Sequence, residues 1–395
     1  IFHAFPGLLP GGFVGVDIFF VISGFLITSI LLEGFATQTF SFRQFYQKRI
    51  TRIFPALIIV LIFCYGMGWF FLFADEYEQL GKHIAGGSSF IANLIFWQEA
   101  GYFDNVAATK PLLHLWSLGI EEQFYIFWPC LLWFFSKRNL ATLCLISVLA
   151  IASFALNIVA SELNPVADFY SPLTRFWELM AGSVLAWLTI NRPHVFLRTG
   201  DLANVSSGAG LLLLALGLWA IHEGRIFPGY WALIPVAGSV LIIAAGPHAL
   251  INRTLLSRRI LVWFGLISFP LYLWHWPLLV FSRIIYGDVP SKAVRIGLVI
   301  VSIMLAWLTY RWIERPIRFQ WQSRFKAIWL MLLMSLVGFL GYITYFEEGL
   351  RFRRLAEQSR AFEYSEAIAG YIPCNLKPEW RDTSLLALGL NYCVV

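Results

Sequence analysis

Charged residues are scarce in this chain of 395 residues, in which Asp, Glu, Lys and Arg together make up 13%. A soluble globular protein carries about 25% of such residues, so this composition does not supply an ordinary water-exposed surface. Hydrophobic residues instead reach 59%, and the mean hydropathy is +0.70. The composition therefore excludes an ordinary soluble protein and predicts a chain that is largely embedded in a lipid bilayer.

Cysteine is also rare, with five residues in the whole chain. Cys64, Cys130 and Cys144 fall in apolar runs, where a buried thiol behaves as a small hydrophobic group. Cys374 and Cys393 lie in the polar C-terminal part, and two interpretations stay open for them: a disulfide in an oxidising compartment, or two free thiols. The spacings contain no CxxC pair and no His/Cys cluster, so we predict no metal site and no resident cofactor.

The excess of positive charge is small and dispersed. The formal net charge is +6, but the basic residues sit in short loops between apolar runs rather than on one face. This placement is typical of the positive-inside pattern of membrane proteins and speaks against a nucleic-acid partner.

Long apolar runs recur along the chain and predict an all-α polytopic membrane protein. After a truncated first helix that ends near His3, the predicted spans are residues 13–33, 51–73, 112–135, 141–160, 172–190, 206–222, 231–246, 261–284, 294–313 and 327–346. This makes about eleven transmembrane helices. Because the chain opens at Ile1 within an apolar stretch, we expect it to be a fragment.

The loops between these spans predict the orientation. One set of alternate loops holds most of the basic residues between Arg43 and Lys326, whereas the other set holds only Lys82, Lys110, Arg225 and Lys292. The richer set is expected in the cytoplasm, which makes the protein a multi-pass protein of the bacterial inner membrane with a cytoplasmic N-terminus. Residues 1–346 would form the membrane domain, and residues 347–395 a periplasmic linker and the beginning of a further domain.

Ionisable residues inside a bilayer are costly and therefore mark candidate functional positions. His3 stands at the outer end of the first helix, next to a tight turn over residues 4–12, and Asp17 lies on the returning helix. A histidine that a neighbouring carboxylate orients can act as a general base, which makes His3 a candidate for that role. The alternative for Asp17 is a structural one, in which it braces the glycine turn.

Further ionisable residues are expected at a similar depth in the outer half. They are Glu121, Glu122, Arg175, Glu178 and His275. Each has a structural alternative: Arg175 and Glu178 can neutralise one another at i and i+3, and His275 can be a satisfied anchor between tryptophans. Adjacent Glu121 and Glu122 point about 100° apart on a helix, so one of them is expected to be structural.

Arg49 and Arg52 form a separate pair at the cytoplasmic side. One helical turn apart, they present two guanidinium groups to the same anion, such as a phosphate. Positive-inside topology alone also places arginines there, so both interpretations stay open.

Several segments resemble signatures of the acyltransferase 3 family of integral-membrane O-acyltransferases. They are residues 11–27 (GGFVGVDIFFVISGFLI), 45–55 (FYQKRITRIFP), 113–125 (LHLWSLGIEEQFY), 175–178 (RFWE), 268–277 (SFPLYLWHWP) and 314–316 (ERP). They follow the order of the family and cover roughly residues 1–320. The chain is most similar to bacterial peptidoglycan and lipopolysaccharide O-acetylases, in which an SGNH-hydrolase-like domain follows the membrane part.

The resemblance implies roles for individual residues. His3 matches the essential histidine of the family, Asp17 its acidic partner, and Glu122 lies in the EEQFY block. Arg49 and Arg52 match an RxxR motif associated with the acyl-CoA donor. The implied reaction moves an acetyl group from acetyl-CoA, a substrate rather than a bound cofactor, to a hydroxyl of peptidoglycan, of lipopolysaccharide O-antigen or of a lipid-linked precursor.

A different class of function also gathers ionisable residues within a membrane, namely a secondary transporter of a small anionic or acylated solute. Transporters of this class are often built from internal repeats, and none is recognisable in this sequence. The acidic and basic candidates also lie toward opposite sides of the membrane rather than at one midplane gate. The sequence therefore favours the enzyme.

Overall fold

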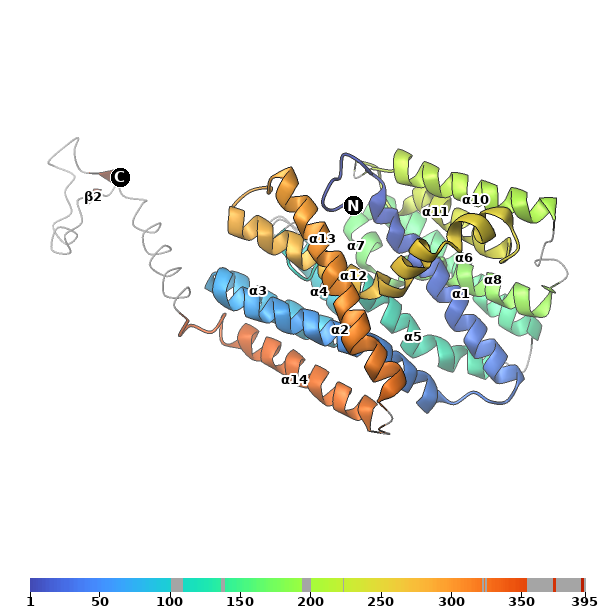
Figure 1. Ribbon diagram of the computed structural model, residues 1–395, viewed down its shortest axis with the longest axis horizontal. Helices are drawn as coiled ribbons and strands as arrows, with labels where there is room; N and C mark the ends of the chain where they lie inside the picture. Colours follow the sequence, from blue (N-terminus) through green and yellow to red (C-terminus); the bar gives the residue numbers. More distant parts are fainter. Residues whose placement is uncertain are drawn as a thin grey trace.

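The computed structural model describes residues 1–100, 109–135, 139–193, 200–222, 224–321, 323, 325–353, 372–373 and 392–393. These residues form a bundle of helices, shown in Figure 1. The α-helices are α1 (Gly15–Ala36), α2 (Phe42–Phe71), α3 (Ala74–Ser88), α4 (Ala92–Glu99), α5 (Leu115–Phe135), α6 (Asn139–Leu163), α7 (Pro165–Tyr170), α8 (Pro172–Asn191), α10 (Asp201–Ala220), α11 (Leu233–Ala244), α12 (Arg259–Tyr286), α13 (Lys292–Leu308) and α14 (Lys326–Phe346).

Shorter elements complete the described part of the chain. They are the 3-10 helices η1 (Gly12–Val14) and η3 (Gly229–Ala232), the π-helices η4 (Asn252–Leu256), η5 (Thr309–Glu314) and η6 (Pro316–Gln320), and the strands β1 (Ile372–Pro373) and β2 (Tyr392–Cys393). The two strands pair antiparallel. The disulfide that the sequence left open between Cys374 and Cys393 involves Cys374, which lies outside the described residues.

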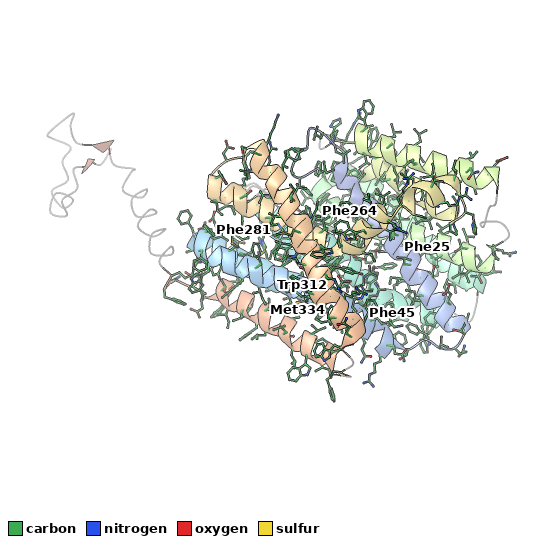
Figure 2. The ribbon with its side chains drawn as sticks, viewed as in Figure 1. Phe25, Phe45, Phe264, Phe281, Trp312 and Met334 are labelled. Carbon is green, nitrogen blue, oxygen red and sulfur yellow. The ribbon has the colours of Figure 1, made fainter. Side chains whose placement is uncertain are left out.

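The prediction of an all-α polytopic membrane protein is confirmed. Seven helical segments of the described chain are long and apolar enough to cross a bilayer: Gly12–Ala36, Phe42–Phe71, Leu140–Leu163, Asp201–Ala220, Arg259–Tyr286, Lys292–Gln320 and Lys326–Phe346. Many apolar side chains on the bundle surface are exposed, including Trp312 at 67% and Phe264 at 37%, both labelled in Figure 2. Such a surface suits contact with lipid tails rather than with water.

Three further predicted spans coincide with helices outside that group of seven. They are α5, α8, and the continuous apolar segment Gly229–Ala244, which is shorter. α5 carries Glu121 and Glu122, and α8 carries Arg175 and Glu178, so polar residues reduce the mean hydropathy of both helices. Burial among other helices makes these polar positions tolerable.

Near the predicted outer surface, one expectation from the sequence is confirmed and another was wrong. The tight turn expected at residues 4–12 is confirmed: turns run to Gly11, where Pro6, Gly7 and Pro10 interrupt helical hydrogen bonds, and η1 follows. The stretch after α2, expected to be a polar loop, instead forms α3 and α4. α3 is amphipathic: Tyr77 and Leu80 are buried, and acidic residues occupy the first turn.

A close crossing of α1 and α8 organises the middle of the bundle. A Cβ atom added to Gly24 would lie 1.8 Å from the Leu179 carbonyl oxygen, and one added to Gly182 would lie 2.1 Å from that of Val21. Small residues let the two backbones approach in this way. Beside the crossing, the Thr28 hydroxyl donates to Ser183 Oγ at 2.8 Å.

Candidate active site

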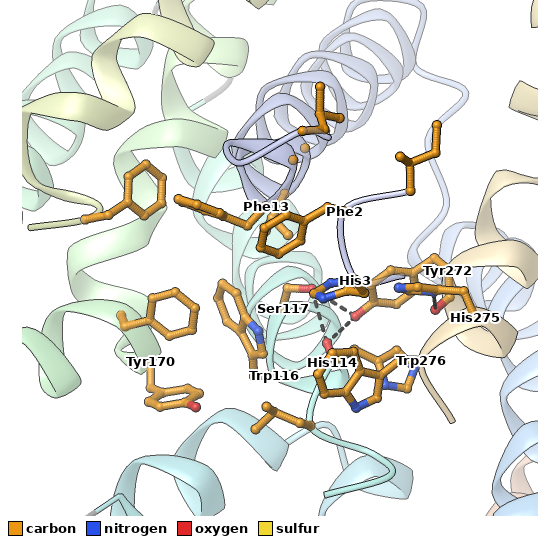
Figure 3. A pocket seen from close by; sticks show the side chains of 18 of the residues that line it. Phe2, His3, Phe13, His114, Trp116, Ser117, Tyr170, Tyr272, His275 and Trp276 are labelled. Carbon is orange, nitrogen blue, oxygen red and sulfur yellow. Dashed lines mark hydrogen bonds between the residues drawn. The ribbon is translucent and has the colours of Figure 1, made fainter. Parts of the chain in front are cut away.

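A cavity of about 870 Å³ opens among the N-terminal turn, α5, α8 and α12, as Figure 3 shows. Aromatic side chains line much of it, and its polar lining includes three histidines, Ser117, Tyr170, Tyr272 and two arginines. The histidines are His3, His114 and His275. A concave, mainly apolar cavity with a few convergent polar groups is the usual form of a small-molecule site.

His3 reaches the cavity from the N-terminal turn, which two neighbouring helices hold in place. From α13, Arg295 Nη1 donates to the carbonyl oxygen of Ala4 at 2.7 Å. From α10, the Leu218 carbonyl accepts from the Gly11 N–H at 3.0 Å. One side-chain and one backbone hydrogen bond therefore hold the turn that carries His3. The His3 ring lies next to the His275 ring, with 5.4 Å between centroids.

His114 is a member of the site that the sequence interpretation did not single out. Its side chain is 7% exposed, and within the described part of the chain neither ring nitrogen has a hydrogen-bond partner. Its carbonyl accepts from the Tyr272 hydroxyl, which also shares a hydrogen bond with Ser117 Oγ at 2.9 Å. The sequence did contain a signal for His114. This residue directly precedes an apolar helix in the LHLWSL segment, and a histidine buried there needs a hydrogen-bond partner.

Asp17 does not reach His3 in the way that was expected. Its Oδ1 accepts from Arg175 Nη2 at 3.0 Å, and Arg175 Nη1 lies 3.1 Å from Glu178 Oε1. All three side chains are fully buried, and no hydrogen bond joins Asp17 to His3 among the described residues. Arg175 also lines the cavity. The structure thus joins three of the candidates into one ion cluster beneath the cavity.

Glu121 and Glu122 lie away from the cavity, farther along α5. Glu121 Oε1 accepts from Ser23 Oγ at 2.7 Å and from the Tyr125 hydroxyl. Glu122 is 7% exposed, and its Oε1 has no hydrogen-bond partner in the described part of the chain. The candidates expected at one depth therefore fall into two groups, one at the cavity and one nearer the predicted cytoplasmic side.

The two arginines of α2 belong to this second group. The Arg49 guanidinium lies 5.2 Å from the centroid of the Tyr125 ring, whose hydroxyl bonds to Glu121. Arg52 and Arg49 both interact electrostatically with Glu121 and Glu122. Both arginines remain half-buried. They form a cationic patch that is partly compensated by carboxylates and still open to an anion.

No group of three or more His, Cys, Asp and Glu side chains within the described ranges has the arrangement of a metal site. The cavity therefore offers proton-transfer and hydrogen-bonding groups, while the arginine patch offers positive charge. The two are joined by α5, along which Ser117 and Tyr125 are about 12 Å apart at the rise of an α-helix.

Comparison with known proteins places this arrangement in context. Residues 1–311 match the model of a family described as an acyltransferase domain. The chain is 35% identical over 325 residues to the putative peptidoglycan O-acetyltransferase YrhL of Bacillus subtilis, covering 78% of this chain and 51% of that protein. It is 32% identical over 349 residues to the O-acetyltransferase OatA of Staphylococcus aureus, covering 83% of this chain and 55% of that protein.

A further relative is the peptidoglycan O-acetyltransferase OatA of Listeria monocytogenes, which is 28% identical over 373 residues. The match covers 86% of this chain and 58% of that protein. The chain thus spans about half the length of these curated relatives. No solved structure matches it.

Proposed function

The chain belongs to this acyltransferase family, and on that premise we propose that it is a membrane O-acetyltransferase acting on a cell-surface carbohydrate. The acetyl donor in this proposal is an acyl-CoA, and the acceptor is a sugar hydroxyl. One observation carries the proposal: the helix α5 runs from the histidine-lined cavity to the arginine patch of α2.

The arginine patch suits the donor. Arg49 and Arg52 are half-buried, one turn apart on α2, and face the buried carboxylates of α5. Two guanidinium groups can bind the phosphates of a CoA nucleotide with charge-assisted hydrogen bonds. In this proposal the patch lies at the cytoplasmic side, as the positive-inside distribution of the loop charges predicts, and acyl-CoA is supplied from there.

The cavity suits the transfer step. His3 accepts the proton of the acceptor hydroxyl as its oxygen attacks the thioester carbonyl carbon. The carbon–sulfur bond then breaks, and the proton held by His3 passes to the departing CoA sulfur. His3 returns to its neutral form, so the step needs no metal ion and no further reactant.

The names of the relatives make peptidoglycan the preferred acceptor in this proposal. Two of the three relatives described above carry that polymer in their names. Lipopolysaccharide O-antigen was an equal expectation from the sequence and stays as an outcome of the test. The aromatic side chains around the cavity give flat surfaces that can pack on sugar rings.

The proposal is tested with purified protein in liposomes and radiolabelled acetyl-CoA supplied to one face at a time. We expect label to move to peptidoglycan fragments with donor at the face of Arg49 and Arg52. His3→Ala is expected to lower the rate by about 10²–10⁴ because a general base is lost, while acetyl-CoA binding persists. Exposed His248→Ala is the matched control.

Three results would count against the proposal in different ways. Transfer by His3→Ala at the normal rate would remove His3 from the chemistry. Label on O-antigen but not on peptidoglycan would change the acceptor. Absence of both donor binding and transfer from either face would reject the enzyme itself.

A further inference from the structure

Of the three aromatic rings in contact with the His3 ring among the described residues, only that of His275 can accept a hydrogen bond from it. Three aromatic rings surround it, those of Phe2, Trp276 and His275, at 4.8, 4.6 and 5.4 Å between centroids. Phe2 has no polar side-chain atom, and the Trp276 indole N–H donates to the Lys110 carbonyl at 2.9 Å. His275 remains, as Figure 3 shows beside His3.

The backbone of α12 determines which nitrogen of His275 carries a proton. His275 Nδ1 lies 2.8 Å from the Tyr272 carbonyl oxygen and 3.1 Å from that of Leu271. A carbonyl oxygen can only accept, so Nδ1 is the protonated nitrogen. In the neutral ring Nε2 then holds a lone pair. Because His275 lines the cavity, this lone pair is available to a group within it.

A third imidazole, His114, lies near His275, with 6.0 Å between the ring centroids. Neither of its ring nitrogens has a hydrogen-bond partner among the described residues. Pro277 has no N–H, so the Leu273 carbonyl four residues earlier lacks its usual helical donor. That carbonyl interacts with the His114 ring, although no full hydrogen bond forms. The His3 ring lies closer to His275, with 5.4 Å between the centroids.

Asp17, the carboxylate expected to orient His3, instead forms an ion pair with Arg175 inside the ion cluster. Other titratable or charged groups around the cavity are His114 before α5, Tyr272 on α12, Tyr170 on α7, and Arg175 and Arg225. None of these is in ring contact with His3 among the described residues, whereas His275 is.

We propose that His275 is the positioning residue for His3. The two rings are adjacent, with no hydrogen bond between their nitrogens among the described residues; rotation of the His3 side chain brings the N–H of one of its nitrogens to His275 Nε2 and leaves the other His3 nitrogen as the base. The inference rests on the proposed acetyl transfer and assigns a role within it. When His3 takes the hydroxyl proton, it becomes an imidazolium with two N–H groups. One of them faces the His275 lone pair, which stabilises the charged form until the proton passes to the CoA sulfur.

The test compares His275→Leu and His275→Gln with the wild-type protein in the liposome assay. We expect His275→Leu to lower kcat about 10²-fold, with KM for acetyl-CoA unchanged because the arginine patch is intact. The acid limb of kcat/KM should move to lower pH, since the His3 imidazolium loses its acceptor. His275→Gln, whose amide oxygen can take the place of Nε2, should recover part of the rate. Exposed His248→Gln is the control.

A purely structural role for His275 predicts something else and would overturn the proposal. In that case the two variants lose activity together with folded protein, and the acid limb of the remaining activity stays in place. An independent readout is the ¹⁵N spectrum of histidine-labelled wild-type protein. If the His275 signal is that of the Nε2–H tautomer, the positioning role is contradicted even when the assay shows transfer. If the signal is that of the Nδ1–H tautomer but the wild-type protein transfers no acetyl group, the proposed function fails instead.

Discussion

At the scale of single residues, Arg175 is the charge on which the buried acids depend. Asp17 and Glu178 are fully buried and share this one guanidinium. Arg175→Met would leave carboxylates without a counter-charge in the bundle interior, and breaking a buried ion pair in this way costs about 3–5 kcal/mol. We expect a large fall of the thermal midpoint of the detergent-purified protein.

Two comparisons isolate the charge effect of Arg175. The double variant Asp17→Asn with Arg175→Met removes one of the stranded carboxylates and should recover part of the lost stability. Exposed Arg225→Met should change the midpoint little, because surface substitutions usually stay within about 0.5 kcal/mol. Equal midpoints for Arg175→Met and the wild type would show that the cluster does not stabilise the bundle.

At the scale of helices, the crossing of α1 and α8 predicts strong sensitivity at two glycines. Gly24→Ala places a Cβ against backbone, 1.8 Å from the Leu179 carbonyl oxygen, so the helices must separate. Overpacking of this kind costs about 1–3 kcal/mol or more. Gly66→Ala on α2 has nothing within 4 Å and serves as the control. The measurement is the yield of monodisperse protein and its thermal midpoint, and equal values for the two variants would contradict the crossing.

At the same crossing, the helices were predicted correctly from the sequence, but the contacts between them were not. Apolar length was enough to predict the helices, because each span has to satisfy its own backbone within the bilayer. It was not enough to predict that Asp17 faces α8, since a depth along one helix says nothing about the neighbour on each face. For the same reason Glu121 and Glu122 were grouped with the cavity, although they lie farther along α5 near Arg49.

Helices α3 and α4 were missed for another physical reason. A scan for long apolar runs does not register α3, which is amphipathic, or α4, which has only 8 residues. The packing of α3 on α14 depends on Gly81 and Gly341, where the two backbones approach closely. His275 was selected from the sequence, but its protonated nitrogen depends on a rotamer that only the structure gives.

At the scale of the whole molecule, one partly buried carboxylate, that of Glu99, joins three segments that lie apart in the chain. Glu99, at the end of α4, accepts from His83 Nε2 at 2.8 Å and from Lys110 Nζ at 3.0 Å, and Lys82 Nζ lies 2.8 Å away. Lys110 precedes α5, and its carbonyl also holds Trp276 beside His3. The cluster therefore links the outer helices to the wall of the cavity.

This cluster makes the stability of the protein depend on pH in a defined direction. Burial alone would raise the pKa of Glu99, but the hydrogen bond and charge of His83, with the two lysines, hold it well below its usual range. A carboxylate with a lowered pKa in the folded state contributes stability above its unfolded pKa of about 4.3, and this contribution is lost as the pH falls further.

Glu99→Gln should therefore lower the thermal midpoint at pH 7, and the difference from the wild type should shrink below about pH 4. Exposed Asp75→Asn is the control. A difference between Glu99→Gln and the wild type that stays constant from pH 7 to the acid range would mean that the charge of Glu99 does not hold these segments together.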